Sequence, residues 1–188
     1  MRAITNIDRS FRWLGRFPLA VDLADTVRVV GDQEVDLLDA ETLEVWIAAE
    51  LSRHPRVSAA TGRLEGVRDL RDLVRGLLAA HARGESLPES GVQAINRASA
   101  RSPSFPVLST DGSHENVEVN NSAFDLFTAE VARSLIAVIS EDPPRVAHCN
   151  APRCGMFFLR VNPRQRWCSP ECGNRARVAR HAERVASG

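Results

Sequence analysis

Lysine is absent from this 188-residue chain, so all 24 of its basic Lys/Arg side chains are arginines. A GC-rich genome also favours arginine, so arginine enrichment alone is weak evidence for a binding surface. No segment approaches the roughly 18 apolar residues of a membrane span. The first residues, MRAITNIDRSFRW, carry charges where a signal peptide has its apolar core. We therefore expect a cytoplasmic protein that does not bind membranes.

Catalytic motifs are also missing. The sequence has no G-x-S-x-G elbow, no phosphate-binding glycine loop and no H-E-x-x-H pair. It has no internal repeat and no low-complexity tract. Its 44% hydrophobic and 26% charged residues are typical of a globular protein. We expect a protein that is not an enzyme.

Four cysteines lie near the C-terminus in the pattern C-x4-C, thirteen residues, C-x3-C: Cys149, Cys154, Cys168 and Cys172. Two close pairs joined by such a loop favour a tetrahedral thiolate site, which suits Zn²⁺. Two disulfides or four unrelated buried cysteines are the alternatives, but a reducing cytosol favours metal ligation. Four thiolates leave no open position for a catalytic water, so the zinc is expected to be structural. His148 and His181 are spare candidate ligands.

Residues around the cysteines predict a treble-clef-like finger. Gly155 permits a left-handed turn after the first pair. Residues 156–161 and 165–167 read as the two strands of a hairpin. Ser169 is a good N-cap, which places Cys172 in the first turn of a helix.

The tetrad Cys172-Gly173-Asn174-Arg175, preceded by Trp167-Cys168-Ser169, resembles the CGNR zinc finger. That finger occurs at the C-terminus of bacterial proteins described as stress-induced transcription regulators, and the resemblance covers residues 145–185. Members usually carry an N-terminal helical domain called ABATE, which the PLAVDLADT segment and the chain length resemble. The chain departs from the family at Arg160 and Pro170, where aspartate and methionine are common.

This resemblance implies two domains, an ABATE-like helical domain over residues 1–144 and a CGNR zinc finger over 145–188. The expected fold class is mainly α with a small β-hairpin. Residues 141–144, Glu-Asp-Pro-Pro, form the expected junction.

Charge divides the chain at the same place. From residue 145 onward nine arginines face two glutamates, a net +7, while the first 144 residues carry fifteen arginines and twenty-two acids, a net −7. A basic end on an acidic body indicates a nucleic-acid-facing surface. The candidate contact residues are Arg164, Arg166, Asn174, Arg175, Arg177, Arg180 and Arg184. Alternatively, Arg175 packs on Trp167 and Asn174 bonds the cysteine knuckle.

The finger helix is expected to have a second, apolar face. Val178, Ala182 and Val185 share that face, which we expect to rest against the finger hairpin.

Apolar periodicity predicts five body helices, over residues 18–29, 40–51, 60–83, 89–100 and 122–140, and a hairpin over 106–119. Phe11, Trp13 and Phe17 are expected to cover a core or form an edge strand. Asp22 and Asp25 fit a solvated face better than a ligand contact. The arginines and acids of residues 63–75 are expected to form solvated ion pairs.

We therefore expect a bacterial DNA-binding transcription regulator. Zinc-dependent folding would present an arginine-rich helix to DNA, while the body senses a small-molecule effector or stress signal, or forms a homodimer. The alternative is a ligand-binding or enzymatic body whose finger contacts protein or RNA.

Overall fold

Helices dominate the computed structural model, which describes residues 14–30, 33–119 and 122–186. The helices are α1 (Leu19–Ala24), α2 (Ala40–Glu50), α3 (Leu64–Ala82), α4 (Glu89–Ala100), α5 (Ala123–Ile139) and α6 (Pro170–Ala186), with a 3₁₀ helix η1 at Pro55–Ala60. Antiparallel strand pairs are β1 (Val27–Val30) with β2 (Gln33–Asp36), β3 (Ser104–Leu108) with β4 (His114–Glu118), and β5 (Val146–His148) with β6 (Phe157–Leu159). The predicted mainly α fold with small β elements is confirmed. Phe11 and Trp13 lie outside the described residues.

The core forms around α1, whose six residues are all buried. This helix packs against α3 and α5. Helix α3 buries the spaced side chains Val67, Leu70, Val74 and Leu77, and α5 is buried or half-buried everywhere except Ala123 and Ala137, as its continuous apolar sequence predicts. On the other side, Trp46 of α2 meets Phe127 of α5 edge-on at 6.4 Å.

Capping residues begin α2 and α5 where the sequence predicts. The Asp39 carboxylate accepts from the backbone N–H groups of Glu41 and Thr42, and the Thr42 hydroxyl accepts from Asp39 N–H. The Ser122 hydroxyl accepts from Asp125 N–H at 3.1 Å. Each bond satisfies an N–H that has no partner inside the helix.

The predicted helix over residues 18–29 is wrong beyond Ala24. The Thr26 hydroxyl donates to Leu23 O at 2.7 Å, and residues 27–30 leave the helix as strand β1. Val27 pairs with Asp36 across the hairpin. Three valines in four residues favour a strand over a helix, because β-branched side chains pack well on a pleated surface.

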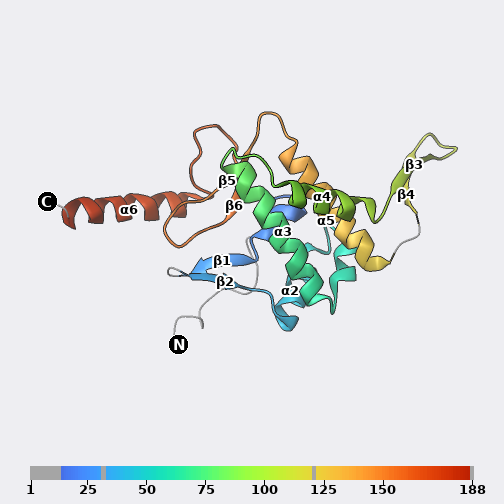
Figure 1. Cartoon of the computed structure of the whole chain (residues 1–188), viewed down its shortest axis with the longest axis horizontal. Coiled ribbons are helices and arrows are strands. Elements are labelled where there is room, and N and C mark those ends of the chain that lie inside the picture. Colours follow the sequence, from blue (N-terminus) through green and yellow to red (C-terminus); the bar gives the residue numbers. More distant parts are fainter. Residues whose placement is uncertain (1–13, 31–32, 120–121, 187–188) are drawn as a thin grey trace.

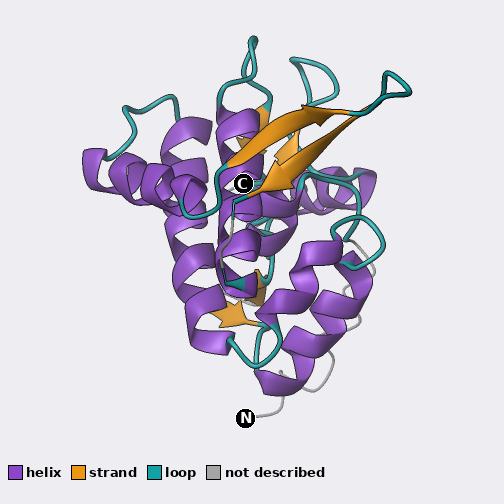
Figure 2. Cartoon of the chain, turned by 90° about the vertical axis from the view of Figure 1, so that its right-hand side faces the viewer, coloured by secondary structure: helices purple, strands orange, loops and turns teal. Residues whose placement is uncertain are grey.

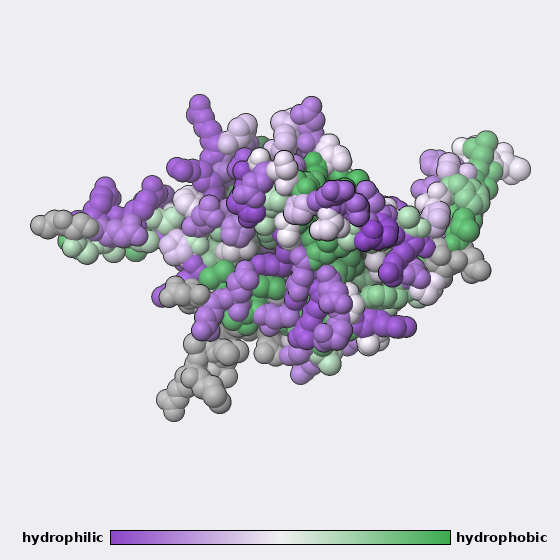
Figure 3. Space-filling model, viewed as in Figure 1, coloured by the Kyte–Doolittle hydropathy of each residue, from purple (hydrophilic) through white to green (hydrophobic). Residues whose placement is uncertain are grey.

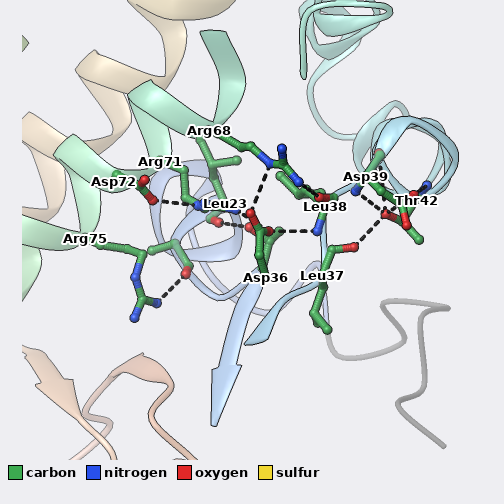
Figure 4. Close-up of polar contacts among 12 residues, drawn as sticks. Leu23, Asp36, Leu37, Leu38, Asp39, Thr42, Arg68, Arg71, Asp72 and Arg75 are labelled. Atoms are coloured by element: carbon green, nitrogen blue, oxygen red, sulfur yellow. Dashed lines mark hydrogen bonds and ion pairs between the residues drawn. The ribbon is translucent and has the colours of Figure 1, made fainter. Parts of the chain in front are cut away.

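Arginines of α3 bond to the β1–β2 hairpin and the end of α1 (Figure 4), in addition to forming ion pairs of the predicted kind with the exposed acids Glu65 (Arg68, 3.0 Å) and Asp72 (Arg71, 2.9 Å). Arg71 is only 4% exposed and donates to Asp36 Oδ1 at 2.5 Å, while Arg68 Nε lies 3.0 Å from Asp36 Oδ2. Arg75 donates to Ala24 O at 2.8 Å. The acidic neighbour Asp72 remains exposed as expected. These contacts hold the hairpin against α3.

Two elements project from the body at opposite ends, α6 at one and the β3–β4 hairpin at the other (Figure 1). Viewed from the hairpin end, β3 and β4 stand in front of the helices (Figure 2). The hairpin lies where predicted, and Phe105, Val107 and Leu108 on β3 are exposed.

The hydrophobic core continues across the predicted boundary at residue 144. Val146 and Phe157, from β5 and β6, belong to the same buried cluster as the helices of the body. Phe157 N–H donates to the buried Asp25 carboxylate at 2.8 Å, and Val29 N–H donates to Cys154 O at 3.4 Å. The cysteine-bearing segment is therefore built onto the α1–β1 corner.

This arrangement also corrects the solvated face predicted for Asp22 and Asp25, because both are buried. Asp22 accepts from Arg53 at 3.0 Å, and Arg53 also bonds the buried Glu50 at 3.1 Å. Burial raises the pKa of Asp22 to about 6 and that of Glu50 to about 7. These carboxyls belong to the interior rather than to a surface site.

Candidate metal centre and finger surface

The first cysteine pair sits in a tight turn between β5 and β6. Cys149 N–H donates to Met156 O at 2.8 Å, and Cys154 N–H donates to Ala151 O at 3.2 Å. Gly155 adopts the left-handed conformation predicted for it, with φ of 69°. The turn folds both thiols toward the same point.

The second pair is carried by the start of α6. The Ser169 hydroxyl accepts from Cys172 N–H at 3.3 Å, so Cys172 lies in the first helical turn, as predicted. Cys168 precedes the helix, and its N–H donates to Cys149 Sγ at 3.4 Å. The backbone of one pair thus bonds a sulfur of the other.

The returning strand predicted over residues 165–167 is wrong. Strand β6 pairs with β5 instead, Val146 facing Leu159. The Gln165 side chain accepts from Val161 N–H at 2.9 Å and donates to Trp167 O at 3.0 Å. These local side-chain bonds replace a strand ladder and hold an irregular loop.

All four sulfurs lie within 4.8 Å of one another. Cys154–Cys168, Cys168–Cys172 and Cys172–Cys154 are separated by 3.6, 3.4 and 3.5 Å. A disulfide needs about 2.05 Å, whereas a tetrahedral zinc site with bonds of about 2.3 Å places its sulfurs about 3.8 Å apart. The cysteines are free, three of them are buried, and their spacing fits Zn²⁺.

The cysteines do not all favour the thiolate form, because the hydrogen bond with Cys149 raises the pKa of Cys154 to about 12. Hydrogen bonds from Cys154 and Cys168 lower the pKa of Cys149 to about 2, while the pKa of Cys168 is raised by its thiol neighbours. Four thiolates this close repel one another unless a cation lies between them. Arg175 Nη2 also donates to Cys172 Sγ at 3.0 Å, a contact that would orient and stabilise this thiolate when a metal is bound.

The spare histidines lie outside the cluster. Among the described residues, the group able to hold a metal there consists of the four cysteines. His148 Nδ1 bonds Asn150 Oδ1 at 3.1 Å, and its ring meets Phe157 edge-on at 5.2 Å. His181 is exposed on α6.

Helix α6 carries Arg177, Arg180 and Arg184 exposed along its length. Arg177 donates to Asn174 Oδ1 at 3.2 Å, so the Asn174 side chain faces the helix surface. The alternative in which Asn174 bonds the cysteine knuckle is therefore not what the structure has. Arg180 and Arg184 each donate to a backbone oxygen one turn earlier. These contacts spread the guanidinium groups along the helix.

The opposite, apolar face of α6 was predicted to pack on the finger hairpin, and this prediction is wrong. Val178 is 60% and Val185 is 68% exposed, and the buried residues of α6 are Cys172 and Ala176. Figure 3 shows the helix standing free, hydrophilic along one side and apolar along the other. The prediction failed because the hairpin packs against the body core through Val146 and Phe157, and shares a buried cluster only with the first turn of α6, at Cys172.

Arg175 differs from the other candidate contact residues because it turns toward the metal centre. Beside it, Gly173 lies against Trp167, where a Cβ would come within 3.0 Å of the indole. Arg164 and Arg166 are exposed on the loop before the second pair. Arg160 lines a cavity together with Arg164 and Arg166. The sequence did not indicate this role, because Arg160 was predicted to lie in a strand and no neighbouring residue pointed to a site.

Comparisons with known proteins agree with this architecture. The ABATE family model, described as "Putative stress-induced transcription regulator", matches residues 18–142, and the CGNR zinc finger model matches residues 145–185. No curated protein matches the chain. Within the described residues, no helix has the length and apolar character needed to cross a membrane. Both families are of regulator and zinc finger types rather than enzymes. The chain belongs to the ABATE family and ends in a CGNR finger whose four-cysteine cluster binds structural zinc.

Proposed function

We propose that this protein is a DNA-binding transcription regulator whose zinc centre holds α6 in position to contact DNA. The proposed ligands are Cys149, Cys154, Cys168 and Cys172. Bound zinc would cross-link the β5–β6 turn to the start of α6. It would leave no coordination position open for chemistry.

The observation that carries the proposal is the free-standing arginine face of α6. The helix has 17 residues, a length of about 26 Å, and an α-helix fits the major groove of B-DNA. Arg177, Arg180 and Arg184 are spaced three and four residues apart, so they lie on one side. Arginine binds phosphates and reads guanine edges.

One acid, Glu183, lines the same hollow as Arg177, Arg180 and Arg184, whereas acid pairing is widespread among the arginines of the body. Many of them pair with carboxylates, as in Arg56–Glu118 at 2.7 Å and Arg83–Glu85 at 2.6 Å. An arginine whose charge is balanced by an acid contributes little to phosphate binding. The net +7 of residues 145–188 is thus concentrated on the finger.

Duplex binding by fluorescence anisotropy across a salt series tests the proposal. The zinc-loaded chain should bind at low salt, and Arg177→Gln, Arg180→Gln and Arg184→Gln together should reduce the salt slope by about 2–3. A charge-matched control replaces Arg56, Arg83 and Arg101 of the body with glutamine and should bind as the parent does. A chain without affinity for DNA at low salt, but with affinity for RNA or a protein, would instead support the alternative reading of the finger.

The body offers a cleft for the proposed effector. The cleft lies along α3, α4 and α5, has a volume of about 590 Å³, and is lined by Leu70, Leu73, Ala98 and Phe124 with Arg97 and Arg101 at its polar side. Small-molecule sites are typically apolar clefts with a few polar groups. A thermal-shift screen should find ligands whose stabilisation is lost in Ala94→Phe, which fills the cleft.

A further inference from the structure

A second basic feature of the finger is a cavity beside the zinc centre, formed by β5, the end of β6 and the loop that leads to Cys168. Its volume is about 560 Å³. The residues that matter for its chemistry are His148, Arg160, Pro163, Arg164, Arg166 and Trp167. Three arginines thus line the same cavity as an indole and a proline ring, and no carboxylate lines it.

The three arginines are uncommitted. Within the described part of the chain, none of the guanidinium groups of Arg160, Arg164 and Arg166 has a hydrogen bond or ion pair. Nε of the half-buried Arg160 is enclosed and has no acceptor. A buried donor without a partner costs free energy, so an acceptor that enters the cavity would gain that bond. The opposite case is Arg145, which holds Glu141 at 2.7 Å.

The loop holds this arrangement in place before any ligand arrives. Gln165 bonds the backbone at Val161 and Trp167, and Arg164 N–H donates to Asn162 Oδ1 at 3.1 Å. The two ends of the loop are fixed by β6 and by the cysteine cluster. A preformed site binds with a smaller entropic cost than a loop that must order.

We propose that this cavity, which we call the loop pocket, is a phosphate-ester site that holds one nucleotide unit of a DNA strand. The three arginines bind the phosphate, since guanidinium forks match phosphate oxygens. Trp167 and Pro163 provide an apolar wall for the sugar or base. The apolar wall beside the three arginines points to a nucleotide rather than to a phosphate alone as the occupant. This inference rests on the proposed function for the source of the phosphate, because a free nucleotide offers the same chemistry.

The test uses the full zinc-loaded chain labelled with 5-fluorotryptophan, and Trp167→Phe assigns the ¹⁹F signal of residue 167. The probes are a DNA duplex, a single-stranded oligonucleotide, deoxyadenosine monophosphate and inorganic phosphate. The pocket variant carries Arg160→Gln, Arg164→Gln and Arg166→Gln, and the control variant carries Arg177→Gln, Arg180→Gln and Arg184→Gln on α6. Zinc content and melting temperature should equal those of the parent in both variants.

We expect DNA to shift the Trp167 signal, and the pocket variant to lose that shift and at least about tenfold in affinity, with a salt slope lower by about 2–3. The control variant should bind more weakly but keep the shift. The pocket would be overturned if the pocket variant kept the DNA affinity and salt slope of the parent while the control variant lost DNA affinity. The proposed function would then still stand. A shift with deoxyadenosine monophosphate but no DNA binding would support the phosphate-ester site and overturn the proposed function. No shift with any probe would overturn the pocket.

Discussion

At the scale of single residues, three buried carboxyls stand out in the body. Asp22 and Glu50 share Arg53, and Asp25 holds the N–H of Phe157. Burial is the main cause of the raised pKa of each one, and the charge of Asp22 further raises that of Glu50. Folding therefore favours the protonated carboxyls.

This raised pKa predicts a pH dependence of stability. Glu50 takes up a proton on folding, so its contribution is complete below the ordinary pKa of 4.5 and is lost as the pH rises through about 7. Glu50→Gln should therefore gain stability over the parent between pH 6 and 8, reaching about 1–3 kcal/mol at pH 8. Thermal melts in excess zinc measure the difference, with Glu44→Gln on the exposed face of α2 as control. If the stability difference between Glu50→Gln and the parent did not change with pH, the raised pKa of Glu50 would be contradicted.

Arg175 donates to Cys172 Sγ, so we expect it to support metal binding. Arg175→Ala should weaken zinc binding about tenfold, because loss of an outer-shell donor usually costs 10–100-fold in affinity. Competition with a chromophoric chelator measures the change. Arg177→Ala, two residues along the same helix, should leave zinc affinity unchanged. Equal affinities of the two variants would show that the sulfur contact is unimportant.

At the scale of elements, the sequence predicted best where local chemistry decides. Helices α2, α4 and α5 begin and end close to their predicted limits because caps and prolines mark them. The cysteine pairs came together as predicted because each pair lies in one local turn. The β1–β2 hairpin and the β5–β6 pairing were missed, since both depend on packing against α3 and α1 rather than on local sequence.

One close approach between these elements is testable. Gly155 has φ of 69°, and a Cβ there would lie 2.5 Å from Val29 Cγ2. Gly155→Ala should destabilise the protein by about 1–3 kcal/mol from backbone strain and more from the clash. Adding Val29→Ala should restore the stability lost to the clash but not the stability lost to backbone strain. Gly76→Ala, on an open stretch of α3, should be neutral or stabilising, and a similar loss there would argue against a local cause.

At the scale of the whole molecule, the β5–β6 hairpin joins the body core to a second buried cluster that holds Cys149, Cys154 and Cys172. Phe157 and Val146 lie in the body core, and Arg75 stacks over Phe157 at 5.7 Å. The sequence could not predict this, because the charge change and the prolines at residues 141–144 mark a boundary that the core does not respect. Helix α6 is the exception, since its buried residues end at Ala176.

Zinc removal should therefore loosen the body as well as the finger. Chelation should increase hydrogen exchange at α1 and β1, because Phe157 and Cys154 bond Asp25 and Val29 there. Exchange in α4, which lies away from the metal, should change least. If hydrogen exchange at α1 and β1 were the same with and without chelator, the proposed link between the metal centre and the body would be wrong.

In the proposed function, zinc orders the finger so that its arginines can bind DNA. The most direct measurement is duplex affinity at low salt for one protein sample before zinc removal, after it, and after one equivalent of zinc is restored. We predict that affinity falls at least about tenfold on removal and returns on addition, since structural zinc contributes to folding directly. Affinity that is the same with and without zinc, or absent in the zinc-loaded protein, would contradict the account.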